Sequence, residues 1–348
     1  MKPTVPGRLH AHGLTTPRFD TAVDVVRHLG CVQSQLHDMA LWAVARRTDG
    51  LTLADAQAAF ERGDFLRTHI LRPTWHFIDP VDLPWLMALT APRIRQIMTS
   101  SWSALGLAPE LIDKGSEVIV AAVSDGAPHT RAEIADALEA AGLQAKGTFL
   151  VHQLMNAEIS LLVANGPMRG KQHTYVALPP ATIDMPHDEL LAESARRYVL
   201  GHGPFRDKDL AWWTSLTLTD SRRAIELAEL RPLDVDGQAY WTLDEPIDAE
   251  VPRVMLLSNF DEYISYARDP EDYAGFEGTV DDVMRGSGLL MIDGRLSGRW
   301  TRSITAKTVK IEVDRAPRLT APIRRALDAE AAAFGHFVGR EPELVIAG

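Results

Sequence analysis

The sequence predicts an α+β fold in which one pattern, three helices followed by two short strands, recurs three times in tandem. Such a unit is typical of the winged helix, a helix-turn-helix variant. Beyond Pro252 the pattern changes to short apolar or alternating segments, which indicate a small β subdomain. We therefore expect winged-helix units over residues 1–100, 101–180 and 181–250, and the β subdomain over residues 251–348.

Local signals place the elements of the first unit. Asp20 is a plausible N-cap for its first helix, and Leu71-Arg72-Pro73 joins its two strands. The predicted helices span residues 21–29, 36–47 and 52–62, and the predicted strands span residues 67–70 and 74–78.

The second and third units carry their own signals. Thr130 and Glu133 have the spacing of a capping box, which begins a helix, and Asp236-Gly237 is a hairpin turn. The second unit is predicted to contain helices at 109–123, from 130 onward and at 148–159, and strands at 160–163 and 173–178 around a turn at 165–171. The third unit is predicted to contain helices at 188–200, 206–215 and 219–230, and strands near 233–235 and 240–242.

The C-terminal segment is predicted to hold four strands and a closing helix. Asp293-Gly294 is expected to form a tight turn between the second and third of these strands. The strands are predicted at 254–257, 288–292, 298–301 and 308–313, and the helix at 321–337.

Composition indicates a globular intracellular protein. Its 46% hydrophobic and 24% charged residues are ordinary for a folded chain. The single cysteine, Cys31, excludes an internal disulfide and a cysteine-rich zinc site. No apolar run approaches the ~20 residues of a membrane span, and no signal peptide is recognisable. We expect a cytoplasmic protein that has no membrane partner.

The net charge of −11 argues at first against a nucleic-acid partner, because phosphate contacts need basic surface. The acidity is concentrated, however. Residues 181–250 carry 7 Lys+Arg against 15 Asp+Glu, whereas residues 1–100 carry 11 against 9. A basic channel in the first unit is therefore compatible with an acidic body.

Two amides, Gln33 and Gln35, stand one residue apart just after the first predicted helix. If this stretch is extended, their side chains share one face and could hydrogen-bond a water, a sugar or a base edge. Helix capping or a solvated surface is the alternative. Asp38 follows at the start of the next helix, where it could act as a general base or simply complement the helix dipole.

The predicted ribbon at 65–78 is rich in cations and rings. Arginines suit phosphate, and an aromatic ring can stack on bases or wedge between them. The alternatives are bonding of the histidines to the hairpin backbone, or a metal site, for which no third ligand with suitable spacing exists. The candidate DNA-contacting residues of the ribbon are Arg67, His69, Arg72, Trp75 and His76. The loop at 169–175 adds Arg169 and Lys171, unless it is only an exposed turn.

Other residue pairs receive structural interpretations. Asp261 and Glu262 could do acid–base work, but adjacent side chains of a strand point apart, and ion pairs with Arg299 or Arg302 are expected instead. No phosphate-binding glycine fingerprint and no Gly-x-Ser-x-Gly element occurs, so neither a nucleotide site nor a hydrolase triad is supported. His10 and His12, near the N-terminus, are expected to be solvated. Trp212 and Trp213 are expected to belong to the core.

Five motifs occur in an order that resembles the winged-helix DNA glycosylases of the AlkZ type, the crosslink-repair glycosylase family. The resemblance spans residues from about 8 to 340. Ser34 departs from the better-known members, which carry an apolar residue there. The motifs are Gln33-Ser34-Gln35, Arg67 to Phe77, Gly170 to Tyr175, Phe260 to Tyr263, and Asp293 to Trp300.

The resemblance implies three winged helices in a C-shaped arrangement, a β-barrel-like element, and DNA across the concave face. It assigns catalysis to Gln33 and Gln35. Glycosylases break the base–sugar bond through an oxocarbenium-like transition state. A cationic alkylated purine leaves as a neutral base and needs no general acid, so two amides that orient a water could suffice. Asp38 could assist as a general base.

We therefore predict a monofunctional DNA repair glycosylase for cationic alkylated purines, including bulky or crosslinked ones. The expected partner is damaged double-stranded DNA. We expect a monomer in the cytoplasm, associated with the nucleoid, with no cofactor and no metal. The alternatives are a winged-helix regulator that binds DNA without enzyme activity, and a fold that has lost DNA binding and serves a protein or small-molecule partner.

Overall fold

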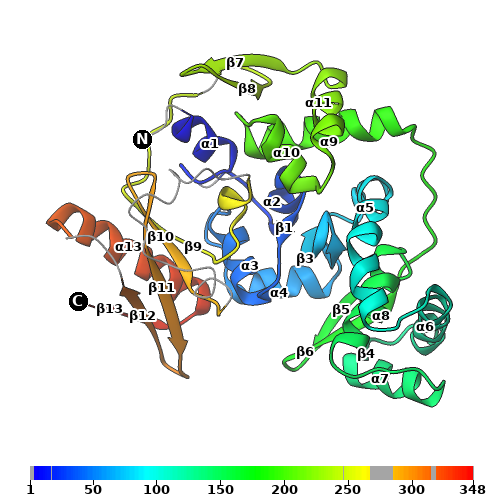
Figure 1. Ribbon diagram of the computed structural model, residues 1–348. Coiled ribbons are helices and arrows are strands. Elements are labelled where there is room, and N and C mark those ends of the chain that lie inside the picture. The colour runs from blue at the N-terminus through cyan, green and yellow to red at the C-terminus, as the bar shows by residue number, and fades with distance from the viewer. Residues whose placement is uncertain (1–3, 17, 246, 267–284, 315–318, 348) are drawn as a thin grey trace.

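The computed structural model describes residues 4–16, 18–245, 247–266, 285–314 and 319–347. It is a mixed α+β structure, which confirms the predicted class. The N-terminal helices lie at the centre of the view, with the second group of elements to the right, the third above and the C-terminal strands to the left (Figure 1). The described strands form sheets of six, five and two strands.

Side-chain caps begin two of the N-terminal helices. Thr52 and Asp55 form a reciprocal capping box at one of them. The predicted Asp20 cap is wrong by one residue: the Thr21 side chain accepts from the N–H of Asp24, because an extended N-cap backbone aims its hydroxyl at the first turn. The helices are α1 (Val5–Ala11), which was not predicted, α2 (Ala22–Leu29), α3 (His37–Ala45) and α4 (Leu53–Glu61).

The predicted ribbon is a tight hairpin. Its strands, β2 (Leu66–Ile70) and β3 (Arg72–Ile78), are joined by Leu71 alone, whose φ is +64°. A left-handed backbone is unfavourable for a residue with a side chain, and burial of the Leu71 side chain holds the turn in place. β1 (Val32–Gln33) lies antiparallel to β3, with Gln33 opposite His76.

One antiparallel sheet joins this hairpin to the next one along the chain. β2 pairs with β5 where Arg67 faces Asn165, and the strand order is β1-β3-β2-β5-β6-β4. The predicted capping box of Thr130 and Glu133 is confirmed. The elements of the second group are α6 (Pro109–Ala122), β4 (His129–Thr130), α7 (Arg131–Ala140), α8 (Thr148–Ile159), β5 (Val163–Arg169) and β6 (Gln172–Ala177).

The turn predicted at 165–171 is mostly strand. β5 continues to Arg169, and only Gly170 and Lys171 separate it from β6. Gly170 has a φ of +64°, a conformation that glycine adopts without strain and that allows such a short turn.

The helix α5 (Leu83–Ala104) has 22 residues and was not predicted. It contains Pro92, which removes one backbone hydrogen bond and normally argues against a helix interior. Burial of apolar side chains such as Leu86 and Ile94 outweighs that cost. Of the helices in the described ranges, α5 included, none is long and apolar enough to cross a membrane.

The third group contains three helices and an isolated hairpin. Its turn, Asp236-Gly237, has positive φ at both residues, as the predicted two-residue hairpin requires. The elements are α9 (His187–His202), α10 (Asp207–Thr214), α11 (Leu218–Leu227), β7 (Arg231–Val235) and β8 (Gln238–Thr242).

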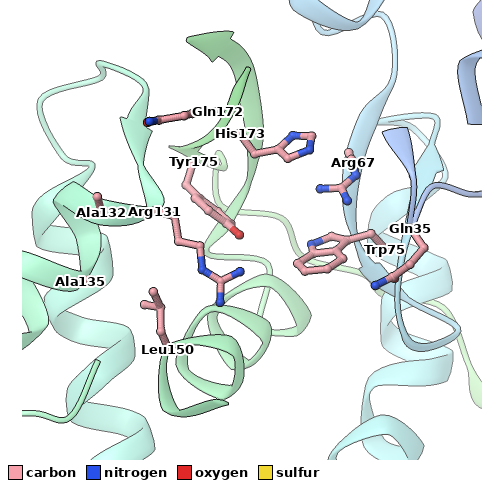
Figure 2. Close-up of a pocket in the computed structure, with 10 residues that line it drawn as sticks. All are labelled: Gln35, Arg67, Trp75, Arg131, Ala132, Ala135, Leu150, Gln172, His173 and Tyr175. Atoms are coloured by element: carbon pink, nitrogen blue, oxygen red, sulfur yellow. The ribbon is translucent and has the colours of Figure 1, made fainter. Parts of the chain in front are cut away.

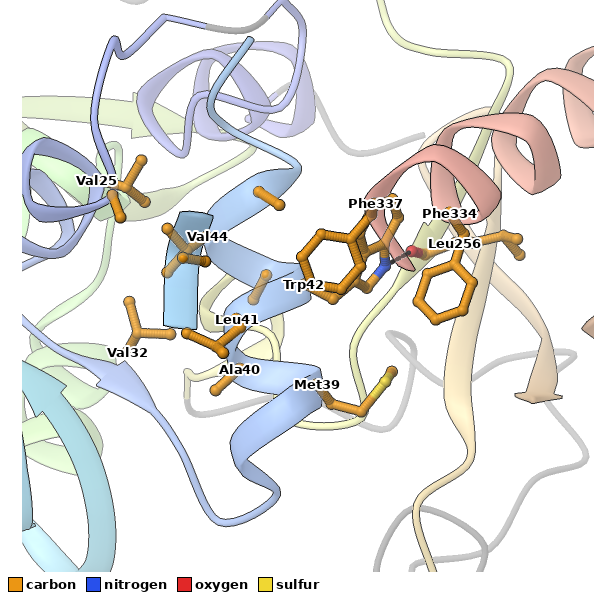
Figure 3. Close-up of a cluster of buried hydrophobic side chains, with 14 of the residues drawn as sticks. Val25, Val32, Met39, Ala40, Leu41, Trp42, Val44, Leu256, Phe334 and Phe337 are labelled. Atoms are coloured by element: carbon orange, nitrogen blue, oxygen red, sulfur yellow. Dashed lines mark hydrogen bonds between the residues drawn. The ribbon is translucent and has the colours of Figure 1, made fainter. Parts of the chain in front are cut away.

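The C-terminal strands share one hydrophobic core with the N-terminal helices (Figure 3). The Trp42 indole donates to the Leu256 carbonyl at 2.8 Å and packs edge-on against Phe334. Gly288 admits no side chain, since a Cβ there would lie 2.2 Å from Trp300 Nε1.

The five-stranded sheet has the order β13-β12-β11-β10-β9, and β13, which was not predicted, joins it in parallel to β12. Its elements and the helix beside it are β9 (Val254–Leu257), β10 (Gly288–Ile292), β11 (Arg295–Ile304), β12 (Thr308–Asp314), α13 (Ala321–Val338) and β13 (Glu341–Ile346).

The ion pairs predicted for Asp261 and Glu262 are wrong. Asp261 forms a two-pronged pair with Arg47 at 2.7 and 3.0 Å, and both side chains are fully buried. Nor do the two acids lie in a strand: Asp261 caps a short 3-10 turn at Glu262–Ile264. Of the predicted partners, Arg299 pairs with Asp314 in the neighbouring strand, and Arg302 donates to the Gly286 carbonyl.

His12 and Trp212 do not have the burial that the sequence predicts. The His12 side chain is fully buried rather than solvated, and it packs edge-on against His202 and Tyr263. Trp213 belongs to the core, but Trp212 is 39% exposed. Successive side chains of a helix point in different directions, so α10 can bury only one of the two tryptophans.

Buried histidines predict that the fold loses stability in acid. Burial lowers the pKa of His28 to about 4 and the pKa of His12 well below its usual value. The unfolded chain then binds more protons than the folded one, so the free energy of unfolding falls as the pH drops below about 6.5, by up to about 1.4 kcal/mol per pH unit for each such histidine, until the folded pKa is reached. Urea unfolding between about pH 8 and pH 5 tests this; a constant midpoint would contradict it.

Candidate functional site

A cavity of about 580 Å³ lies between the β2–β3 hairpin and the elements α7, α8 and β6. Gln35, Trp75 and Arg67 project from one side, and Arg131 and Tyr175 face them from the other (Figure 2). The residues that line it are Gln35, Arg67, Trp75, Arg131, Ala132, Ala135, Leu150, Gln172, His173 and Tyr175.

Gln35 is the candidate catalytic residue that the structure places at this cavity. Its Oε1 atom is buried and has no hydrogen-bond partner among the residues described. A buried carbonyl oxygen without a partner is rare, because desolvation without a hydrogen bond is costly. The described residues therefore leave this acceptor of Gln35 unsatisfied, at a residue that lines the cavity.

Gln33 does not line the cavity. β1 ends at Gln33, and of the two amides only Gln35 lines the cavity, so the structure does not bring them together on one wall. The Gln33 N–H donates to Glu262 Oε1 at 2.8 Å, and its side-chain Oε1 accepts from Arg72 Nη2 at 3.3 Å. A guanidinium only donates hydrogen bonds, so Gln33 turns its oxygen to Arg72 and leaves its amide N–H groups for another acceptor.

Arg72 connects Gln33 to the third group of elements. Its guanidinium donates to the Trp213 carbonyl at 2.8 Å and lies 4.4 Å from the ring centroid of Trp212. It also lies 3.2 Å from His76 Nε2. Burial, then the charge of Arg72, lowers the pKa of His76, so this histidine is neutral and accepts from Arg72. Its other nitrogen then donates to the Thr74 carbonyl at 3.0 Å.

The remaining ribbon residues are turned inward. The Arg67 guanidinium donates to the Ser34 carbonyl and to Asn165, and lies 4.6 Å from the centroid of the Trp75 ring. His69 and Trp75 both bond the buried carboxylate of Glu158, the indole at 3.3 Å. Arg67, His69 and His76 are almost fully buried, so contact of the two histidines with DNA would need the ribbon to rearrange, whereas Arg67 faces the cavity.

The other predicted site residues lie outside the cavity. Asp38 is exposed in the first turn of α3, and its charge acts on Arg302 of β11. Arg169 is bound to Glu133 of α7 at 2.7 Å and is half exposed. Lys171 is exposed at the turn between β5 and β6.

Sequence reasoning missed the far wall of the cavity. Arg131 is the first residue of α7 and gave no signal beyond its place in a capping box. His173 and Tyr175 occur in a recognised motif, but no role was assigned to them. Burial, then the charge of Glu158, raises the pKa of Tyr175, so its hydroxyl stays protonated. Burial, then the charge of Arg67, lowers the pKa of His173 to about 3, so its ring is neutral.

The residues described by the structure bring together no three His, Cys, Asp or Glu side chains that could hold a metal ion. The two ribbon histidines do not converge, since His69 bonds Glu158 and His76 bonds the hairpin backbone.

Two comparisons with known proteins found matches. A family model described as DNA glycosylase AlkZ-like matches residues 26–337. The solved structure of the Streptomyces sahachiroi DNA glycosylase AlkZ covers 100% of both chains with a TM-score of 0.79 at 22% sequence identity. At that identity the likeness supports the fold. Among curated protein sequences, none matches this chain significantly.

Proposed function

We propose, from the premise that this chain belongs to the AlkZ-like DNA glycosylase family, that it is a monofunctional repair enzyme for cationic alkylated purines in duplex DNA. It hydrolyses the N-glycosidic bond and leaves an abasic site. The observation that carries the proposal is the unpaired, buried acceptor oxygen of Gln35 at a cavity walled by arginines and aromatic rings.

The proposed chemistry uses the two amides differently. An N3- or N7-alkylated purine already carries a positive charge, so it departs as a neutral base without a general acid. Gln35 accepts a hydrogen bond from the attacking water and orients it toward the anomeric carbon. Gln33, whose oxygen is engaged by Arg72, donates its amide N–H groups to the sugar or its phosphate. Positioning of reactants and a matched electrostatic environment supply the rate gain.

Asp38 is the proposed acceptor of the water's proton. It is exposed and does not line the cavity, so its removal is expected to cost less activity than removal of Gln35. A general base removes a proton directly or through one water, so Asp38 is proposed to accept this proton through one intervening water.

DNA is proposed to lie over the hairpin. Of the five candidate residues on the ribbon, Trp75 and Arg72 are partly exposed and contact the DNA strand, His69 and His76 position them from below, and Arg67 faces the cavity. Arg169 and Lys171 contact a phosphate from the tip of the second hairpin. We further propose that the three groups of helices and hairpins are winged-helix units in a C-shaped arrangement, that the C-terminal sheet is barrel-like, and that the protein acts as a monomer in the cytoplasm with the nucleoid.

Arg72→Lys is expected to slow excision by about tenfold and to change DNA affinity little. Lysine keeps the charge, but one ammonium cannot bond Gln33, His76 and the Trp213 carbonyl while it stacks on an indole. Single-turnover excision and fluorescence anisotropy separate the two effects, with Arg196→Lys on the outer face of α9 as the control. An equal loss of rate and affinity would mean that Arg72 acts only as a DNA ligand.

The proposal is tested with duplex DNA that contains N7-methylguanine. After incubation with the protein, heating in alkali breaks the strand wherever an abasic site has formed. Breaks at the lesion support the glycosylase. Binding of the duplex without abasic product favours a non-enzymatic DNA-binding regulator, and failure to retard any duplex at low salt points to a protein or small-molecule partner.

A further inference from the structure

We propose that the cavity beside Gln35 binds a backbone phosphate of the DNA strand, and that Arg131 is its principal ligand. The inference rests on the proposed function only in taking DNA as the partner. It assigns the cavity to the strand rather than to the damaged base.

The charged side chains that line the cavity favour an anionic ligand. Among the residues that the structure describes, Arg67 and Arg131 are the charged residues of its lining, and no carboxylate lines it. The buried acid Glu158, whose charge acts on Arg67 and Tyr175, is bonded to His69 and to the Trp75 indole. The neutral ring of His173 and the Tyr175 hydroxyl add hydrogen-bonding groups without adding negative charge.

The backbone of Arg131 is fixed at the start of a helix, while its side chain has no hydrogen-bond or ion-pair partner among the described residues. It is the first residue of α7, directly after Thr130, whose hydroxyl and N–H close the capping box with Glu133. The carboxylate of Glu133 is engaged by Arg169 at 2.7 Å. Within the described part of the chain, Arg131 has no hydrogen-bond or ion-pair partner, and its guanidinium points into the cavity (Figure 2).

Arg67 provides a second donor from the opposite wall. Its Nε and Nη1 atoms donate to Ser34 and Asn165, which leaves Nη2 without a partner among the described residues. Burial lowers the pKa of Arg67 only to about 10, so the group stays charged at neutral pH. Charge-assisted bonds from two guanidinium groups are well suited to the oxygens of a phosphate.

The same charges argue against the lesion as the occupant. An alkylated purine of the proposed substrate class is a cation, and two arginines in a sheltered cavity would repel it. A volume of about 580 Å³ accommodates a phosphate together with part of its sugar. Because Gln35 shares the lining, a nucleotide held by its phosphate here presents its sugar next to the water-orienting oxygen.

The test is the salt dependence of binding to an undamaged duplex, which requires no excision. Arg131→Gln is expected to weaken binding about tenfold, equally for undamaged and N7-methylguanine DNA, and to reduce the slope of log K against log salt by about 0.9. Arg131→Lys, which restores the charge, is expected to recover the slope. Arg325→Gln, an exposed cation on α13, is the matched control and should leave the slope unchanged. Thermal melting checks that each variant is folded.

Competition by inorganic phosphate tests whether the cavity binds a phosphate of the DNA strand or a small phosphate compound. Replacing chloride by phosphate at constant ionic strength should weaken DNA binding by the wild type more than by Arg131→Gln. An unchanged salt slope in Arg131→Gln would overturn the proposal. If phosphate competes but the slope is unchanged, the cavity serves a small phosphate compound and not DNA. If Arg131→Gln reduces the salt slope as expected but the wild type excises no base, the phosphate site is supported and only the proposed glycosylase activity is refuted.

Discussion

Gln35→Ala is expected to lower the single-turnover rate of excision by about 10²-fold or more, while DNA affinity changes little. The reason is that Gln35 holds the buried acceptor without a partner at the cavity. Loss of one positioned hydrogen-bonding group at a reacting centre typically costs about 10²–10³ in rate. Alkali cleavage at N7-methylguanine gives the rate, and anisotropy with undamaged duplex gives the affinity.

Two comparisons make this result specific. Gln33→Ala should cost less than Gln35→Ala, because Gln33 lies outside the cavity and its oxygen already bonds Arg72. Gln96→Ala, at an exposed position of α5, should have no effect on rate. If Gln35→Ala excised at the wild-type rate, the water would have to be oriented by another group and the mechanism proposed here would be wrong.

Arg47→Met is expected to lower the free energy of unfolding by about 3–5 kcal/mol, the cost of leaving one partner of a buried ion pair alone. Both side chains of the Arg47–Asp261 pair are fully buried, and Arg47 also donates to the His12 and Ala43 carbonyls. The pair therefore ties the N-terminal helices to the 3-10 turn that carries Glu262, the acceptor for the Gln33 N–H.

Urea unfolding followed by tryptophan fluorescence measures this loss. The double variant Arg47→Met with Asp261→Asn removes both charges and should be more stable than Arg47→Met alone. Arg324→Met, which breaks an exposed pair with Asp328 on α13, should shift the midpoint little. A loss in Arg47→Met no larger than in Arg324→Met would show that the buried pair contributes no more than a surface pair.

Elements with a strong local cause were predictable. The capping boxes begin α4 and α7, and the positive φ values at Asp236 and Gly237 turn the hairpin of β7 and β8. Elements that depend on distant partners were not. α5 contains Pro92, a local signal against a helix, and is held by its buried face. β13 exists because β12 offers it a free edge.

The candidate site divides in the same way. Gln35, Arg67 and Trp75 stand in a short stretch of unusual composition, and all three line the cavity. Nothing local marked Arg131 for function. The local sequence pattern also did not predict that the His69 side chain is buried, because its partner Glu158 belongs to a helix far along the chain.

The sequence by itself determined the α+β class, most of the helices and hairpins, and the amide pair with its arginine- and histidine-rich ribbon, since caps, turns and periodicity act within a few residues. Tertiary structure alone decided which of these residues face solvent and which face each other. Pairing of β2 with β5 brings Arg67 beside Asn165, and the same packing sets Arg131 across from Gln35. Such contacts arise from burial of apolar faces between distant elements, which local pattern does not specify.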